Sequence, residues 1–85
     1  MKALVQFDAY AMDYEIKGEI GVLNGIDGVT SATLLKKKTG TAPQFCIELE
    51  IADDKADGFP DAVKRYTSQY AGQVSNVNII LYAPV

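Results

Sequence analysis

The fold is decided by residues 44–51, which read Gln44-Phe45-Cys46-Ile47-Glu48-Leu49-Glu50-Ile51. Apolar residues stand at the odd positions of this stretch, and mostly polar residues stand between them. A period of two residues is typical of a β-strand that buries one of its faces and leaves the other accessible. The stretch therefore predicts a sheet with two unlike faces, one of them packed on a hydrophobic core.

The length of the chain limits how much core it can build. With 85 residues it is predicted to form one domain, spanning residues 1–85. A domain of this size buries only about 60–65% of the surface that its unfolded chain exposes, so association with further copies would add stability. The formal net charge of −3, from 11 acidic and 8 basic residues, offers no overall field for nucleic acid or an anionic membrane. We therefore expect neither as a partner.

The residue types that are missing narrow the chemistry. The chain has no histidine and only one cysteine, which removes the usual zinc ligand sets, an internal disulfide and a histidine haem ligand. We predict no metal site and no bound cofactor. The sequence shows neither a run of about 20 apolar residues nor the pattern of a signal peptide, so we expect a cytoplasmic protein without a membrane partner.

The other elements are read from the same kinds of pattern. Residues 2–10 and 29–38 alternate as strands, and residues 39–43 are rich in turn formers. Asp13 suits the N-cap of a helix over about residues 14–24. Residues 53–58 read as a solvated loop, and a second helix begins near Pro60 and ends at Gly72. The uncharged run of residues 74–82 predicts a last strand.

The order β-α-β-β-α-β is that of the ferredoxin-like fold in the α+β class. It predicts a four-stranded antiparallel sheet of order 4-1-3-2, with both helices on one face. The second and fourth strands are then the edges. Lys36, Lys37 and Lys38 form either a phosphate-binding patch or, as is more common for lysines at the end of a strand, protection of the second strand from unwanted pairing. The fourth strand carries no charge. We expect another subunit to cover it, in a homodimer or a higher homo-oligomer.

The parity of each strand sorts its residues between the two faces. The helix-covered face is expected to take Val5, Phe7, Ala32, Leu34, Phe45, Ile47, Leu49, Ile51, Val77, Ile79 and Leu81. The opposite face is expected to display Leu4, Gln6, Asp8, Tyr10, Thr33, Leu35, Cys46, Glu48, Glu50, Asn76, Asn78, Ile80 and Tyr82. This second set mixes apolar with hydrogen-bonding groups, as the linings of small-molecule pockets do.

The exit of the predicted first helix, Leu23-x-x-Ile26-x-Gly28-Val29, carries a family resemblance. With the length and the element order, it resembles the dimeric α+β barrel superfamily, which includes EthD-like proteins, antibiotic-biosynthesis monooxygenases, stress-responsive barrel proteins, muconolactone isomerases and small polyketide cyclases. The resemblance covers essentially the whole chain. It implies two ferredoxin-like sheets packed open face to open face around a cavity.

Other families share that helix exit, namely metal-associated domains and ligand domains of the ACT or Lrp type. Metal-associated domains carry a CxxC motif after the first strand, where this chain has Ala9-Tyr10-Ala11-Met12-Asp13. EthD-like and haem-dependent barrels use histidine in their chemistry, and this chain has no histidine, so that chemistry is not expected here.

Candidate site residues come from the face without helices. Asp8 and Glu48 are predicted to face the same space from adjacent strands, which are taken to be parallel. Mutual repulsion and burial would then raise the pKa of at least one of these two carboxyl groups and produce a general acid or base near neutrality. The alternative is that both carboxylates lie on a wet surface. Gln6, Tyr10, Cys46, Asn78 and Tyr82 are the predicted ligand-binding residues, with the lone Cys46 read as a packing residue rather than a nucleophile.

Two functions remain open at this point. One is a homodimeric barrel that binds a small hydrophobic or aromatic ligand between its sheet faces. The other is a cofactor-free barrel enzyme, a monooxygenase, isomerase or cyclase, acting on a small cyclic carbonyl compound by acid–base chemistry. The sequence alone leaves open whether the protein is an enzyme.

Overall fold

The computed structural model describes residues 1–9, 23–41, 43–68 and 74–85, with residues 66–68 described by their backbone alone. Its elements are β1 (Lys2–Ala9), β2 (Val29–Lys36), β3 (Phe45–Ile51), the 3₁₀ helix η1 (Asp53–Gly58), α2 (Phe59–Ser68) and β4 (Val74–Tyr82). The four strands and the second helix confirm the predicted elements. The expected first helix lies outside the described residues except at its end, where Leu23 is helical and buried.

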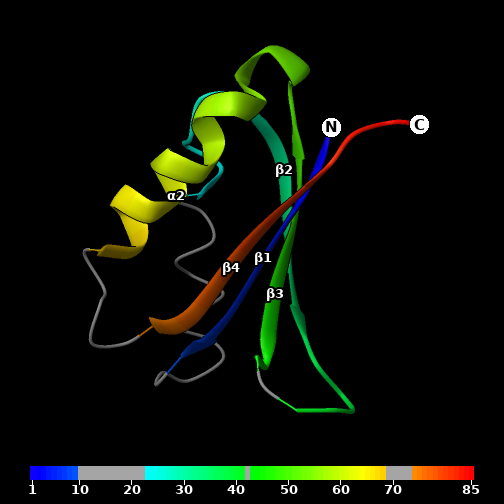
Figure 1. Ribbon diagram of the computed structural model, residues 1–85, viewed down its shortest axis with the longest axis vertical. Coiled ribbons are helices and arrows are strands. Elements are labelled where there is room, and N and C mark those ends of the chain that lie inside the picture. Colours follow the sequence, from blue (N-terminus) through cyan, green and yellow to red (C-terminus); the bar gives the residue numbers. More distant parts are fainter. Residues whose placement is uncertain (10–22, 42, 69–73) are drawn as a thin grey trace.

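The four strands form one antiparallel sheet of order β2-β3-β1-β4, which is the predicted order read from the other edge. Figure 1 shows α2 lying across one face of this sheet, with both chain termini near the same end of the molecule. The chain therefore has a ferredoxin-like α+β fold. None of the helices in the described residues is long and apolar enough to cross a bilayer.

The core lies between the sheet and α2, and it is built from the alternate residues of the two central strands. Val5 and Phe7 of β1 pack with four residues of β3, and Phe59 and Val63 of α2 close the layer from above. The rings of Phe7 and Phe45 stack with their centroids 5.5 Å apart. The β3 members of this core are Phe45, Ile47, Leu49 and Ile51, each at most 5% exposed.

One residue assigned to the core by parity does not belong there. Val77 is 36% exposed and is not part of the buried cluster. The pairing of β1 with β4 shifts register between Gln6 and Asp8, and Asn76 has a positive φ of 56° at that point. A β-bulge thus adds a residue to β4, so strict alternation fails there, and the prediction for Val77 is wrong.

Residues 53–58 also differ from expectation. They form η1 instead of a solvated loop, and the side chain of Ala56 is buried. The preceding Ala52 donates its N–H to the carbonyl of Gly28 at 2.8 Å, and Lys55 pairs with Asp27 at 3.0 Å. These contacts hold η1 against the turn that leads into β2, and they explain why the segment is ordered.

Gly28 occupies a position in this contact that only glycine fits well. Its φ is +93°, and a Cβ added to it would lie 2.4 Å from Cβ of Lys55. We expect Gly28→Ala to lower the free energy of unfolding by about 1–3 kcal/mol, because the backbone would be strained and η1 displaced. Urea denaturation measures this change.

The matched control is Gly58→Ala, because an added Cβ at Gly58 meets nothing within 4 Å. That variant is expected to change the free energy of unfolding by less than about 1 kcal/mol. Equal losses in the two variants would contradict the packing of η1 against the turn at Gly28.

Candidate functional site

The sheet face that points away from α2, called the open face from here on, is not covered by any described element (Figure 1). Strand register arranges its side chains in rows that run across the sheet. One row joins Tyr82, Lys2 and Glu50, and the next joins Ile80, Leu4, Glu48 and Thr33. The third row joins Asn78, Gln6, Cys46 and Leu35, and Asp8 lies beyond it opposite Ser75.

Three of the predicted ligand-binding residues, Gln6, Cys46 and Asn78, come together in the third row. The side-chain amide of Asn78 donates to Oε1 of Gln6 at 3.4 Å, and Leu35 ends the row with 45% of its surface exposed. Tyr82 does not join them, because it lies four positions further along β4 than Asn78. At the rise of a strand this is a distance of roughly 13 Å. Tyr10 lies outside the described residues.

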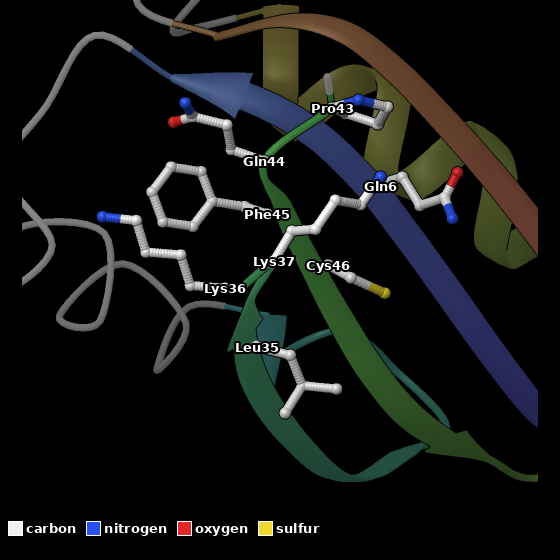
Figure 2. A pocket seen from close by; sticks show the side chains of 8 residues that line it. All are labelled: Gln6, Leu35, Lys36, Lys37, Pro43, Gln44, Phe45 and Cys46. Atoms are coloured by element: carbon white, nitrogen blue, oxygen red, sulfur yellow. The ribbon is translucent and has the colours of Figure 1, made fainter. Parts of the chain in front are cut away.

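A shallow hollow of about 140 Å³ opens at the end of this row, where β2 and β3 approach their turn (Figure 2). Pockets that enclose a small-molecule ligand usually measure about 300–1,000 Å³. The hollow in a single chain is therefore smaller than such pockets. The hollow is lined by Gln6, Leu35, Lys36, Lys37, Pro43, Gln44, Phe45 and Cys46.

Asp8 ties three strands together beside the hollow. Its Oδ1 accepts the backbone N–H of Gln44 at 2.8 Å, and its Oδ2 accepts the side-chain amide of Asn76 at 2.9 Å. Both bonds favour the ionised carboxylate, and with the nearby charge of Lys37 they lower the pKa of Asp8 from its ordinary value of 3.8. Asp8 is thus a structural anion at neutral pH.

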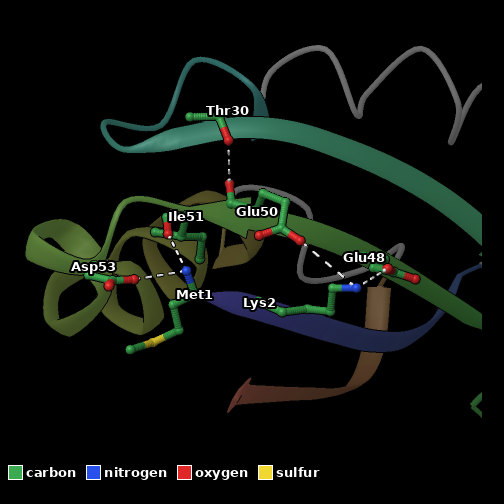
Figure 3. Close-up of polar contacts among 7 residues, drawn as sticks. All are labelled: Met1, Lys2, Thr30, Glu48, Glu50, Ile51 and Asp53. Atoms are coloured by element: carbon green, nitrogen blue, oxygen red, sulfur yellow. Dashed lines mark hydrogen bonds and ion pairs between the residues drawn. The ribbon is translucent and has the colours of Figure 1, made fainter. Parts of the chain in front are cut away.

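The predicted pairing of Asp8 with Glu48 is wrong in its geometry. β1 and β3 run antiparallel, and Glu48 stands opposite Leu4, four residues of β1 away from Asp8. Glu48 instead forms an ion pair with Lys2, in which Nζ of Lys2 lies 2.8 Å from Oε1 of Glu48 (Figure 3). Oε1 of Glu50 lies 3.9 Å from the same ammonium. The hydrogen bond and charge of Glu48 raise the pKa of Lys2. The two carboxylates therefore do not face each other as a pair, and the hydrogen bonds of Asp8 lower its pKa.

Cys46 is half buried in the middle of the open face. Burial raises the pKa of its thiol, and the negative charge of Glu48 adds to this effect. The thiol is therefore protonated at neutral pH and is a poor nucleophile, in keeping with its interpretation as a packing residue.

Sequence reasoning missed the contributions of Asn76, Gln44 and Lys37. Asparagine tolerates positive φ better than most residues, and that was the one available sign of a bulge in β4. Lys37 was interpreted mainly as protection of an edge strand, with a phosphate-binding patch as the alternative, but β2 ends at Lys36 and the Lys37 side chain lies over the hollow. In the described parts of the chain, no three acidic or cysteine side chains gather in a way that could hold a metal ion.

Comparison with known proteins supports the fold. No family model matches the chain, and no curated protein matches it. A solved structure does: a DABB family protein with a ferredoxin-like fold from Mesorhizobium loti, at a TM-score of 0.71. The match covers 99% of this chain and 95% of that chain, at 21% sequence identity. At this identity the likeness establishes the ferredoxin-like fold alone.

The hydrogen bonds to Asp8 lead to a prediction about the pKa of this residue. Asn76→Gly keeps a residue that tolerates positive φ while removing the amide that bonds Asp8, so the pKa of Asp8 should rise towards 3.8. Because folding depresses this pKa, the bond stabilises the native state above the ordinary pKa, and the stabilisation is lost as pH falls through the folded pKa. NMR titration of the Asp8 carboxyl carbon measures the shift.

Asn78→Gly is the control, because the Asn78 amide contacts Gln6 and not Asp8. The pKa of Asp8 should stay at its wild-type value in that variant. An unchanged pKa of Asp8 in Asn76→Gly would contradict the hydrogen bond.

Proposed function

We propose that the protein is a homodimeric α+β barrel that binds a small hydrophobic or aromatic ligand between the open faces of its two sheets. The observation that carries this proposal is the incomplete hollow on an uncovered face. One wall is present, with Leu35 exposed and Gln6 beside it, and the opposite wall is missing. A second sheet laid over the open face would supply that wall.

A second copy of the chain is the occupant that the charges favour. The open face carries both signs at each of its two ends: Lys2 with Glu48 and Glu50 at one end, and Lys37 near Asp8 at the other. A two-fold axis brings the same patch of both subunits together, and such a patch must complement itself. A face that balances its charges locally meets that condition, whereas a face of one sign would repel its copy.

The apolar groups between those ends give the interface its driving force. Leu4 and Ile80 lie side by side in the second row, both half buried in a single chain, and Tyr82 is 51% exposed. Covering them with a second sheet would gain about 25 cal/mol for each Å² of apolar surface removed from water. The edge strand β4, which carries no charge along Val74–Tyr82, adds no electrostatic barrier to association.

The solved structure of the DABB family protein, which has a similar fold, supports the same proposal. It is described as a DABB family protein, and its fold extends over nearly all of this chain. As part of the proposal we therefore group the chain with the dimeric α+β barrels, the class that contains the EthD-like, monooxygenase and stress-responsive types. We propose binding instead of acid–base catalysis, because the pKa of Asp8 is lowered, away from neutrality, and Glu48 is engaged in an ion pair with Lys2.

The proposal predicts a dimer that depends on the open face. Ile80→Lys would place a charge in the middle of the interface, where an unpaired ammonium cannot be desolvated cheaply. We expect the wild-type chain to sediment as a dimer at micromolar concentration and Ile80→Lys to weaken association at least 100-fold. Analytical ultracentrifugation over a concentration series measures both.

Asp61→Lys is the matched control, since Asp61 is exposed on α2, on the other side of the sheet. It introduces the same side chain and should leave association unchanged. Acetophenone, a small aromatic ketone, should shift the side-chain amide signals of Gln6 and Asn78 in the wild type and in Asp61→Lys but not in Ile80→Lys. A monomeric wild-type chain, or equal binding by all three proteins, would overturn the proposal.

A further inference from the structure

We propose that the ligand of this cavity is an organic anion, a small aromatic or aliphatic carboxylic acid whose carboxylate binds Lys37 at the β2–β3 end of the hollow. This inference rests on the proposed function, and it adds the charge and orientation of the ligand. It also assigns an organic-acid binding role to a lysine that sequence patterning explained mainly as protection of an edge strand.

The charged side chains that line the hollow are basic, in a chain that is negative overall. The formal net charge is −3, yet the charged residues that line the hollow are Lys36 and Lys37, and no acidic residue lines it. A concave site walled by one sign of charge raises the local concentration of the opposite ion. The hollow therefore favours anions over neutral molecules of the same shape.

Lys37 is placed to use this field. Figure 2 shows its side chain extending across the hollow, over β3 and towards Gln6 of β1, whereas Lys36 points away on the side of Phe45. The Lys37 ammonium donates to the backbone carbonyl of Thr41 at 2.9 Å, which is a neutral acceptor. Within the described residues it makes no ion pair, so its charge is not neutralised by a direct contact.

The charge of Lys37 acts on Asp8, but among the described residues the two side chains make no ion pair. Its two oxygens already accept from the N–H of Gln44 and the amide of Asn76. An ammonium has three donors, and Thr41 takes one, so donors remain for an incoming carboxylate. With Asp8 bonded to Gln44 and Asn76, the remaining donors of Lys37 are available to a ligand.

The rest of the hollow suits the hydrocarbon part of such an acid. Leu35 and Pro43 are apolar, and the protonated thiol of Cys46 is weakly polar. Further along the row, Oε1 of Gln6 accepts a hydrogen bond from the side-chain amide of Asn78. The N–H groups of the Gln6 side chain have no hydrogen-bond partner among the described residues. A ligand that reaches past the apolar wall would meet this second donor.

Benzoate and benzamide test the inference, because they have nearly the same shape and differ in charge. We expect the wild-type dimer, titrated at pH 7 and followed by NMR shifts of Leu35 and Cys46, to bind benzoate at least tenfold more tightly than benzamide. That preference is the size expected for one hydrogen bond to a charged group. Lys37→Gln should abolish the preference, and 0.5 M NaCl should weaken benzoate binding alone.

Lys38→Gln is the matched control, since Lys38 neighbours Lys37 in the chain but does not line the hollow, and it should keep the preference. Equal affinity for the two compounds in the wild type, or a preference that survives Lys37→Gln, would overturn the inference while leaving the ligand-binding dimer intact. Binding of neither compound would overturn both proposals. Inorganic phosphate binding as tightly as benzoate would show a bare anion site and would overturn the assignment to organic acids.

Discussion

The structure depends on the pairing of β1 between β3 and β4. Because both pairings are antiparallel and in register over most of their length, odd residues of β1 and β3 point into the core and even residues point to the open face. A shift of one residue would exchange the two sets and expose Val5, Phe7 and Leu49 to water. The same constraint that builds the core thus also decides which side chains face a partner or a ligand.

The exception to that alternation lies at the end of the sheet beside the hollow. The bulge at Asn76 interrupts the β1–β4 register, and Asp8 bonds both the bulge and the first residues before β3. Bulges commonly redirect side chains beside binding sites. Here Asn76 of the bulge bonds Asp8, and the Lys37 side chain lines the hollow beside it.

Much of the fold could be predicted from the sequence, because its determinants are local. The period of two in residues 44–51 located β3, and the order of the elements led to the strand order of the sheet. The bulge could not be predicted, because the polar and apolar residues of the run 74–78 fit a regular strand and a strand with one extra residue about equally well. Val77 was therefore assigned to the core although it is 36% exposed.

The candidate site was less predictable than the fold for a similar reason. Parity places a residue on a face but says nothing of its position along the strand, so it grouped Gln6, Cys46 and Asn78 correctly and joined Asp8 to Glu48 wrongly. Which carboxylate meets which cation depends on register. Lys2 at the start of β1 pairs with Glu48, whereas among the described residues the Lys37 ammonium bonds a neutral carbonyl and makes no ion pair.

The central claim is that a second copy of the chain covers the open face. Isotope-filtered NOE spectroscopy on a mixture of ¹³C-labelled and unlabelled chains tests it most directly, because only contacts between copies give a signal. The account predicts intermolecular NOEs at the methyl groups of Leu4, Leu35 and Ile80. A dimer whose intermolecular NOEs arise elsewhere, with those three methyl groups silent, would contradict it.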